Sequence, residues 1–293
     1  MLSREVMGVL ALAILWVNAL LVCGAAGKEL LVVWRLWRRL RPAVLGDEGL
    51  LEGTVSTGRG DRGALASHRV EQVGRYAADD ADKRAIAFSD RSYAGSVFGG
   101  VLETTHGAVQ LVPAADADVW PDPVAQRRAA SCPSPAEFDR AYADAKKARG
   151  FARTIDIEIP ASATVWVLGS LGRGDAGEPR LAPCGDGLLL VSARDPRRFC
   201  RNKMVLLLGF VALSLLAAGA CTAISLVPPH FGVVSTVGAA LGLAYFLLIQ
   251  PAGTAVRDRV RVPSRAVVRG SWVEGVIDAP SSRTDDAADA QAA

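Results

Sequence analysis

Residues 204–250 are MVLLLGFVALSLLAAGACTAISLVPPHFGVVSTVGAALGLAYFLLIQ, two apolar runs (204–227 and 233–250) joined by Pro-Pro-His-Phe-Gly. A third apolar run covers residues 6–27. No Asp, Glu, Lys or Arg interrupts any of the three, and each is close to the ~20 apolar residues with which a helix crosses a bilayer. We therefore predict a membrane protein with three transmembrane helices and a soluble domain between the first and the second.

The composition agrees with this division of the chain. The 293 residues are 51% hydrophobic and the mean hydropathy is +0.25, with the excess concentrated in the three runs. The middle of the chain is long enough for one domain with its own core. The first run is longer than the ~7–15 residues of a signal-peptide core, so we expect a retained helix. A net charge of +3 does not indicate a nucleic-acid partner.

The cysteines do not indicate a metal site or a disulfide framework. The chain has five, at positions 23, 132, 184, 200 and 221, and none forms a CxxC or CxxH pair. We expect no metal and no cofactor. Free thiols in the soluble part favour a reducing compartment.

Basic residues are distributed unequally around the apolar runs. They cluster in the juxtamembrane segment 28–49, before the second run and in the tail that follows the third, but the N-terminal stub has only Arg4 and the Pro-Pro hairpin has none. The positive-inside rule then places the domain and the tail in the cytoplasm, for a multi-pass protein of the cell membrane. At the end of the first helix, five residues are predicted to lie at the membrane interface: Trp34, Arg35, Trp37, Arg38 and Arg39. Their role is anchoring, and specific lipid binding is the alternative.

Small residues in the last two runs predict close helix packing. Gly238 and Gly242 form a GxxxG pattern, which lets helix backbones approach each other. A contact between the second and third helices is the simpler interpretation, and a homodimer seam is the alternative. The absence of charge within the runs argues against a transporter. The tail, 251–293, is basic and then rich in Asp and Ala beyond Val273, which is typical of disorder.

The soluble domain, residues 50–203, is predicted to be mainly β (α+β) with one inserted helix. Ser134, Pro135 and Glu137 have the pattern of a helix start, and Gly150 marks its end. The segment 153–159 alternates apolar and polar residues, as a half-buried strand does. We expect further strands at 50–58, 96–103, 108–113, 164–168 and 188–191, with loops at 59–66 and 118–133 and a charged turn at 79–84.

No segment of the domain has a complete catalytic or ligand-binding pattern. Asp79, Asp80 and Asp82 lack the spacing of an EF-hand, and the glycine-rich segment 169–174 is predicted to be a hairpin turn rather than a phosphate loop. Ser170 has no following helix and so is not an elbow nucleophile. We therefore predict no catalytic and no metal-binding residues.

The remaining ionisable side chains have structural explanations. His68, His106 and His230 have no partner by spacing and are expected to be surface or turn histidines. Asp156 and Glu158 are expected on the solvent face of their strand, although two carboxylates on one face could serve acid–base chemistry.

Several short segments together are similar to a known family. These are Val97-Phe98 followed by Glu103 and by Gly107–Pro113, then Ile155-Asp156-Ile157-Glu158-Ile159-Pro160 with Thr164–Gly169, and finally Leu188–Ser192. With the flanking helices they resemble the GIDE family, whose eukaryotic members are membrane-anchored mitochondrial ubiquitin ligases. The resemblance covers roughly residues 50–203 and implies a β-rich domain between membrane helices.

One part of that family's machinery has no counterpart here. Ubiquitin transfer in those ligases depends on a C-terminal RING, which needs about eight Cys and His ligands in paired spacing. After Cys221 this chain has no cysteine, and its one later histidine is His230. The family's domain also lies in the intermembrane space, whereas the charge pattern places this one in the cytoplasm.

Two functions are therefore weighed. The first is a non-catalytic interaction or scaffolding module at the membrane, with the lipid bilayer, an unidentified protein and, as an alternative, a second copy as partners. The second is an enzyme, either ligase-like by family or a hydrolase that uses His68 or His106. The composition, rich in Ala, Arg and Asp, is typical of a high-GC prokaryote, in which ubiquitin is not expected.

Overall fold

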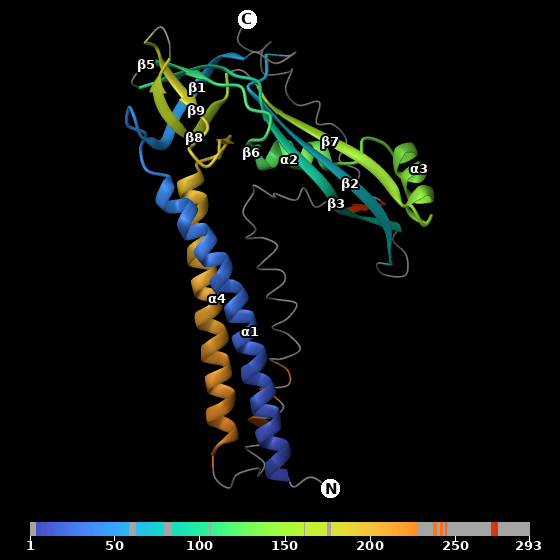
Figure 1. Ribbon diagram of the computed structural model, residues 1–293. Helices are drawn as coiled ribbons and strands as arrows, with labels where there is room; N and C mark the ends of the chain where they lie inside the picture. Colours follow the sequence, from blue (N-terminus) through green and yellow to red (C-terminus); the bar gives the residue numbers. More distant parts are fainter. Residues whose placement is uncertain are drawn as a thin grey trace, which may run out of the picture. The chain divides into compact units, whose positions relative to one another are not determined.

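The computed structural model describes residues 4–58, 63–78, 84–105, 107–160, 162–174, 177–227, 237–238, 241–242, 244 and 271–274 (Figure 1). The chain divides into two units. Residues 1–41 and 196–262 form a helical unit, and residues 42–195 and 263–293 form a unit built mainly of strands. The strand-rich unit therefore includes a piece of the C-terminal tail, which the soluble domain predicted at 50–203 did not contain.

The helical unit contains two long helices, α1 (Arg4–Arg39) and α4 (Pro196–Ser225). Both are longer than the predicted runs, since α1 continues through the basic segment after residue 27 and α4 begins eight residues before residue 204. No glycine or proline occurs between Lys28 and Arg41, so the first helix has no reason to end before Pro42. At ~1.5 Å per residue, both helices exceed the ~30 Å thickness of a bilayer core.

The two helices pack against each other in antiparallel fashion. Trp16 of α1 donates a hydrogen bond from its indole Nε1 to Thr222 Oγ1 at 2.9 Å, while Ala26 and Leu207 share a buried cluster. The buried residues follow a seven-residue repeat, which is the period that keeps a seam between two coiled helices. The repeat comprises Ala19, Ala26 and Val33 on α1, with Cys200, Leu207, Ser214 and Cys221 on α4.

The rest of both helix surfaces is apolar and exposed. Leu21 of α1 is 69% exposed and Leu216 of α4 is 71% exposed, and in the most apolar window of each helix 22% of the residues are buried. A core helix of a soluble protein would be mostly buried. Two helices of the described chain are thus long and apolar enough to cross a membrane, although α1 also lies near the N-terminus, where a signal sequence passes the same test. The third predicted run, 233–250, lies mostly outside the described residues.

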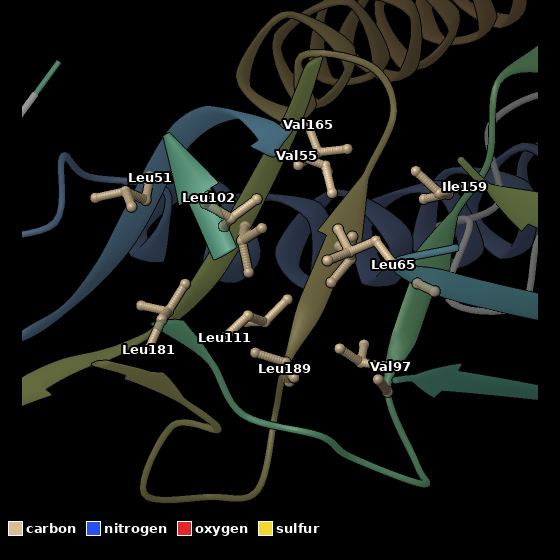
Figure 2. Packing of buried hydrophobic residues seen from close by; sticks show 14 of the residues in the cluster. Leu51, Val55, Leu65, Val97, Leu102, Leu111, Ile159, Val165, Leu181 and Leu189 are labelled. Carbon is tan, nitrogen blue, oxygen red and sulfur yellow. The ribbon is translucent and has the colours of Figure 1, made fainter. Parts of the chain in front are cut away.

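The first part of the β unit is a closed, barrel-like circuit of five strands. Each strand pairs with two others of the set, in the order β1–β4–β5–β9–β8 and back to β1. The strands are β1 (Glu48–Gly58), β4 (Gly100–Thr104), β5 (Gly107–Leu111), β8 (Thr164–Arg173) and β9 (Pro179–Ala182). Two short strands, β10 (Leu190–Ser192) and β6 (Asp118–Trp120), extend the sheet from β8. Figure 2 shows the aliphatic side chains that meet in the core of this sheet.

The second part is a four-stranded sheet in the order β11–β3–β2–β7. Its strands are β2 (Ala66–Ala78), β3 (Arg84–Val97), β7 (Phe151–Ile159) and β11 (Ser271–Val273). Helices α2 (Pro123–Ala130) and α3 (Pro135–Ala145) pack against it (Figure 1). Leu65, Val97 and Ile159, at one end of this sheet, belong to the core of the barrel-like sheet, so the two sheets share one hydrophobic core.

The helix predicted from the capping residues is present. Ser134 is the N-cap of α3, its hydroxyl accepts a hydrogen bond from the Glu137 amide at 3.3 Å, and Pro135 is the first helical residue. The prediction of a single inserted helix was wrong, because α2 occupies part of the expected 118–133 loop. The Asp122 carboxylate caps α2 by accepting from the amides of Val124 and Ala125 at 2.8 and 3.1 Å.

Predicted strands are confirmed where apolar and polar residues alternate. Ile155, Ile157 and Ile159 of β7 are buried, and Asp156 and Glu158 are exposed. The hairpin turn expected at 169–174 was wrong: β8 continues to Arg173, and Leu171 pairs with Leu181 of β9. The expected strand at 96–103 is interrupted at Phe98-Gly99, where Gly99 has φ +86°.

Candidate interaction site

A short segment from beyond the last apolar run completes the four-stranded sheet. Strand β11 pairs antiparallel with β3, with Trp272 opposite Ile86 and Ser271 opposite Ala87. The Glu274 amide then donates to the Arg84 carbonyl oxygen at 2.9 Å. An edge strand that would otherwise expose its backbone groups is therefore covered along residues 84–87.

The Trp272 side chain fills a socket in the sheet's buried face, which Phe88, Phe151 and Arg153 form. Its ring centre lies 4.9 Å from that of Phe88 in an edge-on arrangement and 6.1 Å from that of Phe151. The indole Nε1 donates to the carbonyl oxygen of Ala130, the last residue of α2, at 2.7 Å. Trp272 is 5% exposed, so it is a core residue of the domain.

Arg153 of β7 forms the floor of this socket. Its guanidinium carbon lies 3.5 Å from the centre of the Phe88 ring and 4.7 Å from that of Trp272. Its nitrogens donate twice to Gln72 Oε1, at 2.8 and 2.6 Å, and once to the Ala130 carbonyl oxygen at 3.0 Å. Burial lowers the pKa of Arg153 to about 10, with Asp90 opposing the shift, so the side chain remains charged at neutral pH.

Glycine at position 74 makes room for the aromatic rings. Gly74 of β2 pairs with Phe88 on one side and with Phe151 on the other. A Cβ atom at this position would lie 2.7 Å from Phe88 Cε1 and 2.8 Å from Ile86 Cγ2. The absence of a side chain at position 74 therefore leaves the space that the Phe88 ring occupies beside Arg153 and Trp272.

An ion pair holds the far side of the tail segment. Arg84 donates from Nε to a Glu274 carboxylate oxygen at 2.5 Å and forms a second, shorter hydrogen bond to the other oxygen. The same guanidinium bonds Asp139 of α3 at 2.8 Å. This bidentate contact lowers the pKa of Glu274. The pair lies at the surface, and it orients the segment more than it stabilises it.

A cavity of about 330 Å³ lies beside the socket. Trp272 and Arg153 line it together with Arg128, Ser131, Glu137 and Thr154. A second cavity of about 370 Å³ lies by β1 and β4, lined by Glu52, Thr54, Glu103 and Thr164 among others. Neither holds a group of three or more His, Cys, Asp or Glu side chains suited to a metal, and no such group occurs in the described part of the chain.

The residues predicted at the membrane interface lie in the last two turns of α1. Trp34 and Trp37 are 41% and 43% exposed, and the Arg38 guanidinium lies 4.9 Å from the Trp34 ring centre. Nearby, Arg197 of α4 donates to the Leu40 carbonyl oxygen at 2.5 Å, which places a positive charge at the C-terminal end of α1.

The two glycines predicted to pack in the membrane are both buried in the helical unit. A Cβ atom on Gly238 would lie 2.7 Å from Ser225 Oγ and 2.9 Å from the Ser225 nitrogen, at the end of α4. A Cβ atom on Gly242 would lie 3.8 Å from Leu15 Cδ2 of α1. Gly238 thus faces the second helix, and Gly242 faces the first.

The histidines do not form a site in the described chain. His68 was expected at the surface or in a turn, but it is buried at 2% exposure within β2. His106 and His230, like the aspartates of 79–82, lie outside the described residues. Asp156 pairs through both oxygens with Arg69 across the sheet, at 2.8 and 3.1 Å, so this carboxylate is engaged in an ion pair. Ser170 lies in strand β8.

Comparison with protein-family models, with curated proteins and with solved structures finds no match for this chain. The resemblance to the GIDE family therefore stays a prediction. Its motif segments 155–159 and 164–169 fall in β7 and β8.

Sequence reasoning missed the whole socket. Trp272 lies next to the predicted disordered end of the tail, and Arg153 was predicted only as the first residue of the alternating strand 153–159. The signal that was present is the pair Trp272 and Glu274, an aromatic and an acidic residue placed two apart where the basic part of the tail gives way to its Asp-rich part.

Proposed function

We propose that this chain is a multi-pass membrane protein whose β-rich domain serves as a non-catalytic interaction module on the cytoplasmic face. The observation that carries the proposal is the antiparallel packing of α1 and α4. The helices that enter and leave the domain run side by side, so their domain-proximal ends lie together. Those ends carry the basic residues, among them Arg38, Arg39 and Arg197, that mark a cytoplasmic side.

The tail strand supports a third crossing. Helix α4 starts directly after the domain, so if it spans the bilayer, Ser225 lies on the opposite side. Residues 271–274 nevertheless bond to β3 of the domain. The chain must then return between residues 226 and 270, and the uncharged run 233–250 is the segment suited to that passage.

The function as an interaction module rests on what the domain offers. Its best-formed site is a sheet edge with an aromatic socket, which is a known way of recognising an extended peptide. In the cavity beside it, the hydroxyl of Ser131 donates to the Arg128 carbonyl oxygen rather than to a base. The proposed partners are the bilayer and a protein, and GIDE-family membership is part of this proposal.

Membrane insertion and sidedness are tested with single cysteines in sealed cells. A membrane-impermeant maleimide should label His230→Cys in the hairpin, but not Glu52→Cys in the domain or Ser271→Cys in the tail. The chain without introduced cysteines gives the background from the native thiols. Labelling of Glu52→Cys from outside, or release of the chain by alkaline carbonate, would overturn the proposal.

The interaction role is tested by crosslinking in membranes followed by affinity recovery. The intact chain should recover a defined set of proteins. The control variant Thr54→Trp, which fills the cavity by β1 and β4 away from the socket, should recover the same set. Recovery of no specific protein would contradict the proposal. A ligase is tested separately, since release of ubiquitin from a charged carrier protein would instead favour the enzyme.

A further inference from the structure

Few contacts hold the tail segment, and they are separable from the rest of the domain. Three residues pair with β3, one indole is buried, and one surface ion pair closes the far side. The other strands of this sheet pair over much longer stretches, such as residues 66–78 of β2 with 84–97 of β3. The tail is therefore the part of the sheet that opens at the lowest cost.

The socket keeps its shape by contacts that do not involve the tail. Arg153 is fixed by Gln72 and by the Ala130 carbonyl oxygen, and Gln72 Nε2 donates in turn to Asp90 Oδ1 at 2.6 Å. Phe88 stacks on Arg153 and meets Phe151 edge-on, with ring centres 6.4 Å apart. A site that is already formed before its ligand arrives binds with a smaller ordering cost.

We propose that the β3 edge and its socket form a binding site for an extended segment that carries an indole followed two residues later by a carboxylate, and that a second copy of this chain supplies that segment by tail exchange. The inference deepens the proposed interaction function and rests on it. In the exchanged state, Trp272 of one copy fills the socket of the other, and its Glu274 bonds Arg84 there.

A second copy is the occupant because the fitting segment is carried by every copy. The exchanged contacts equal those in one chain, so the balance depends on local concentration, which tethering in a shared membrane raises. The twenty residues from 251 to 270 precede β11, and a chain of that length reaches at most roughly 70 Å. The length of this segment therefore does not restrict β11 to the sheet of its own chain.

The test uses disulfides between full-length chains. Glu274 and Arg84 are a hydrogen-bonded pair, so by alternation Ser271 and Ala87 form a non-hydrogen-bonded pair with Cα atoms about 4.5 Å apart. That separation suits a disulfide. Chains with Ala87→Cys and differently tagged chains with Ser271→Cys are reconstituted together in vesicles and oxidised.

The expected result is a covalent dimer that carries both tags, formed several-fold more than when Ser92→Cys, an exposed β3 position outside the β11 register, replaces Ala87→Cys. Adding Trp272→Ala to the Ser271→Cys chain should abolish it. A disulfide that forms within the double variant Ala87→Cys/Ser271→Cys, but not between chains, would overturn exchange while leaving the interaction module intact. Absence of both disulfides would overturn the docking register itself.

Discussion

The guanidinium of Arg153 lies 4.7 Å from the centre of the Trp272 ring, and both side chains donate a hydrogen bond to the same carbonyl oxygen, that of Ala130. Two segments far apart in the chain thus donate to the C-terminal end of α2, where carbonyl groups have no partner within the helix. The charge of Arg153 is favourable there because that end carries the negative pole of the helix dipole. The tail thus contacts both the edge strand β3 and the C-terminal end of α2.

Replacing Arg153 by Ala should lower the free energy of unfolding of the domain by about 3 kcal/mol, since it removes three hydrogen bonds of a half-buried charged group, two of them to the buried Gln72. Denaturant titration of the full chain in detergent measures the change. The exposed Arg149→Ala is the matched control and should change stability by less than about 0.5 kcal/mol. Equal effects of the two variants would show that the Arg153 network contributes nothing.

Replacing Trp272 by Ala should release the tail from β3, because truncation of a buried aromatic side chain typically costs about 3–5 kcal/mol. The Ile86 amide, which faces β11 because Ile86 and Trp272 form a hydrogen-bonded pair by the same alternation, should then exchange with solvent much faster. Hydrogen-exchange mass spectrometry of the β3 peptides measures this. The control Ser271→Ala, at an exposed position of the same strand, should leave the exchange rate unchanged. If Trp272→Ala also left it unchanged, β11 would not depend on the Trp272 indole for docking.

Tail docking should weaken in acid. The contact with Arg84 lowers the pKa of Glu274, so the docked state binds fewer protons than the released state. The contribution of this ion pair to docking is therefore fully present above the ordinary glutamate pKa of about 4.3 and is lost as the pH falls through the lowered value. Asp139, which bonds the same guanidinium, faces this pair as well.

The measurement is protection of the Ile86 amide from pH 7 to pH 3, corrected for intrinsic exchange. Glu274→Gln should reduce protection at neutral pH and remove most of its pH dependence. Asp139→Asn separates the contribution of the second carboxylate. A wild-type profile that is flat down to pH 3 would contradict the assigned role of the ion pair.

Replacing Gly238 by Ala should destabilise the helical unit by about 1–3 kcal/mol, the usual range for overpacking, because the new Cβ atom meets Ser225 at 2.7 Å. Gly209→Ala in α4 is the matched control: nothing lies within 4 Å of its Cβ position, and alanine favours the helix by up to ~1 kcal/mol. Thermal unfolding in detergent compares them. Similar melting temperatures for the two variants would show that Gly238 does not pack against α4.

Several elements of the fold could be predicted from local sequence patterns. The alternation of Ile155, Ile157 and Ile159 predicted β7, and Ser134 with Pro135 predicted the start of α3, because burial and capping act over a few residues. The long hairpin β2–β3 escaped prediction for the opposite reason. Two of the inward positions of β2 are His68 and Gln72, both buried, so the apolar period is broken where polar side chains enter the core.

The candidate site depends on contacts between distant segments, which local patterns do not contain. Strand β11 has three residues, too few for any periodicity, and its pairing with β3 becomes visible only in three dimensions. Helix α2 did have a local signal, the cap Asp122 followed by Pro123, but the neighbouring prolines favoured a loop. The seven-residue repeat of buried residues along α1 and α4 was also present in the sequence. It could not be recognised there because the exposed positions of both helices are apolar as well.

The place of β11 in the chain has a consequence for biogenesis. A ribosome completes the β-rich domain, then two long apolar stretches, and only afterwards residues 271–274. Until then the Phe88–Arg153 socket stays open and the outer backbone of β3 is a template for misassociation with other nascent chains. Arrival of Trp272 closes that interval, so this late-made segment covers the β3 edge only after the rest of the sheet has been synthesised.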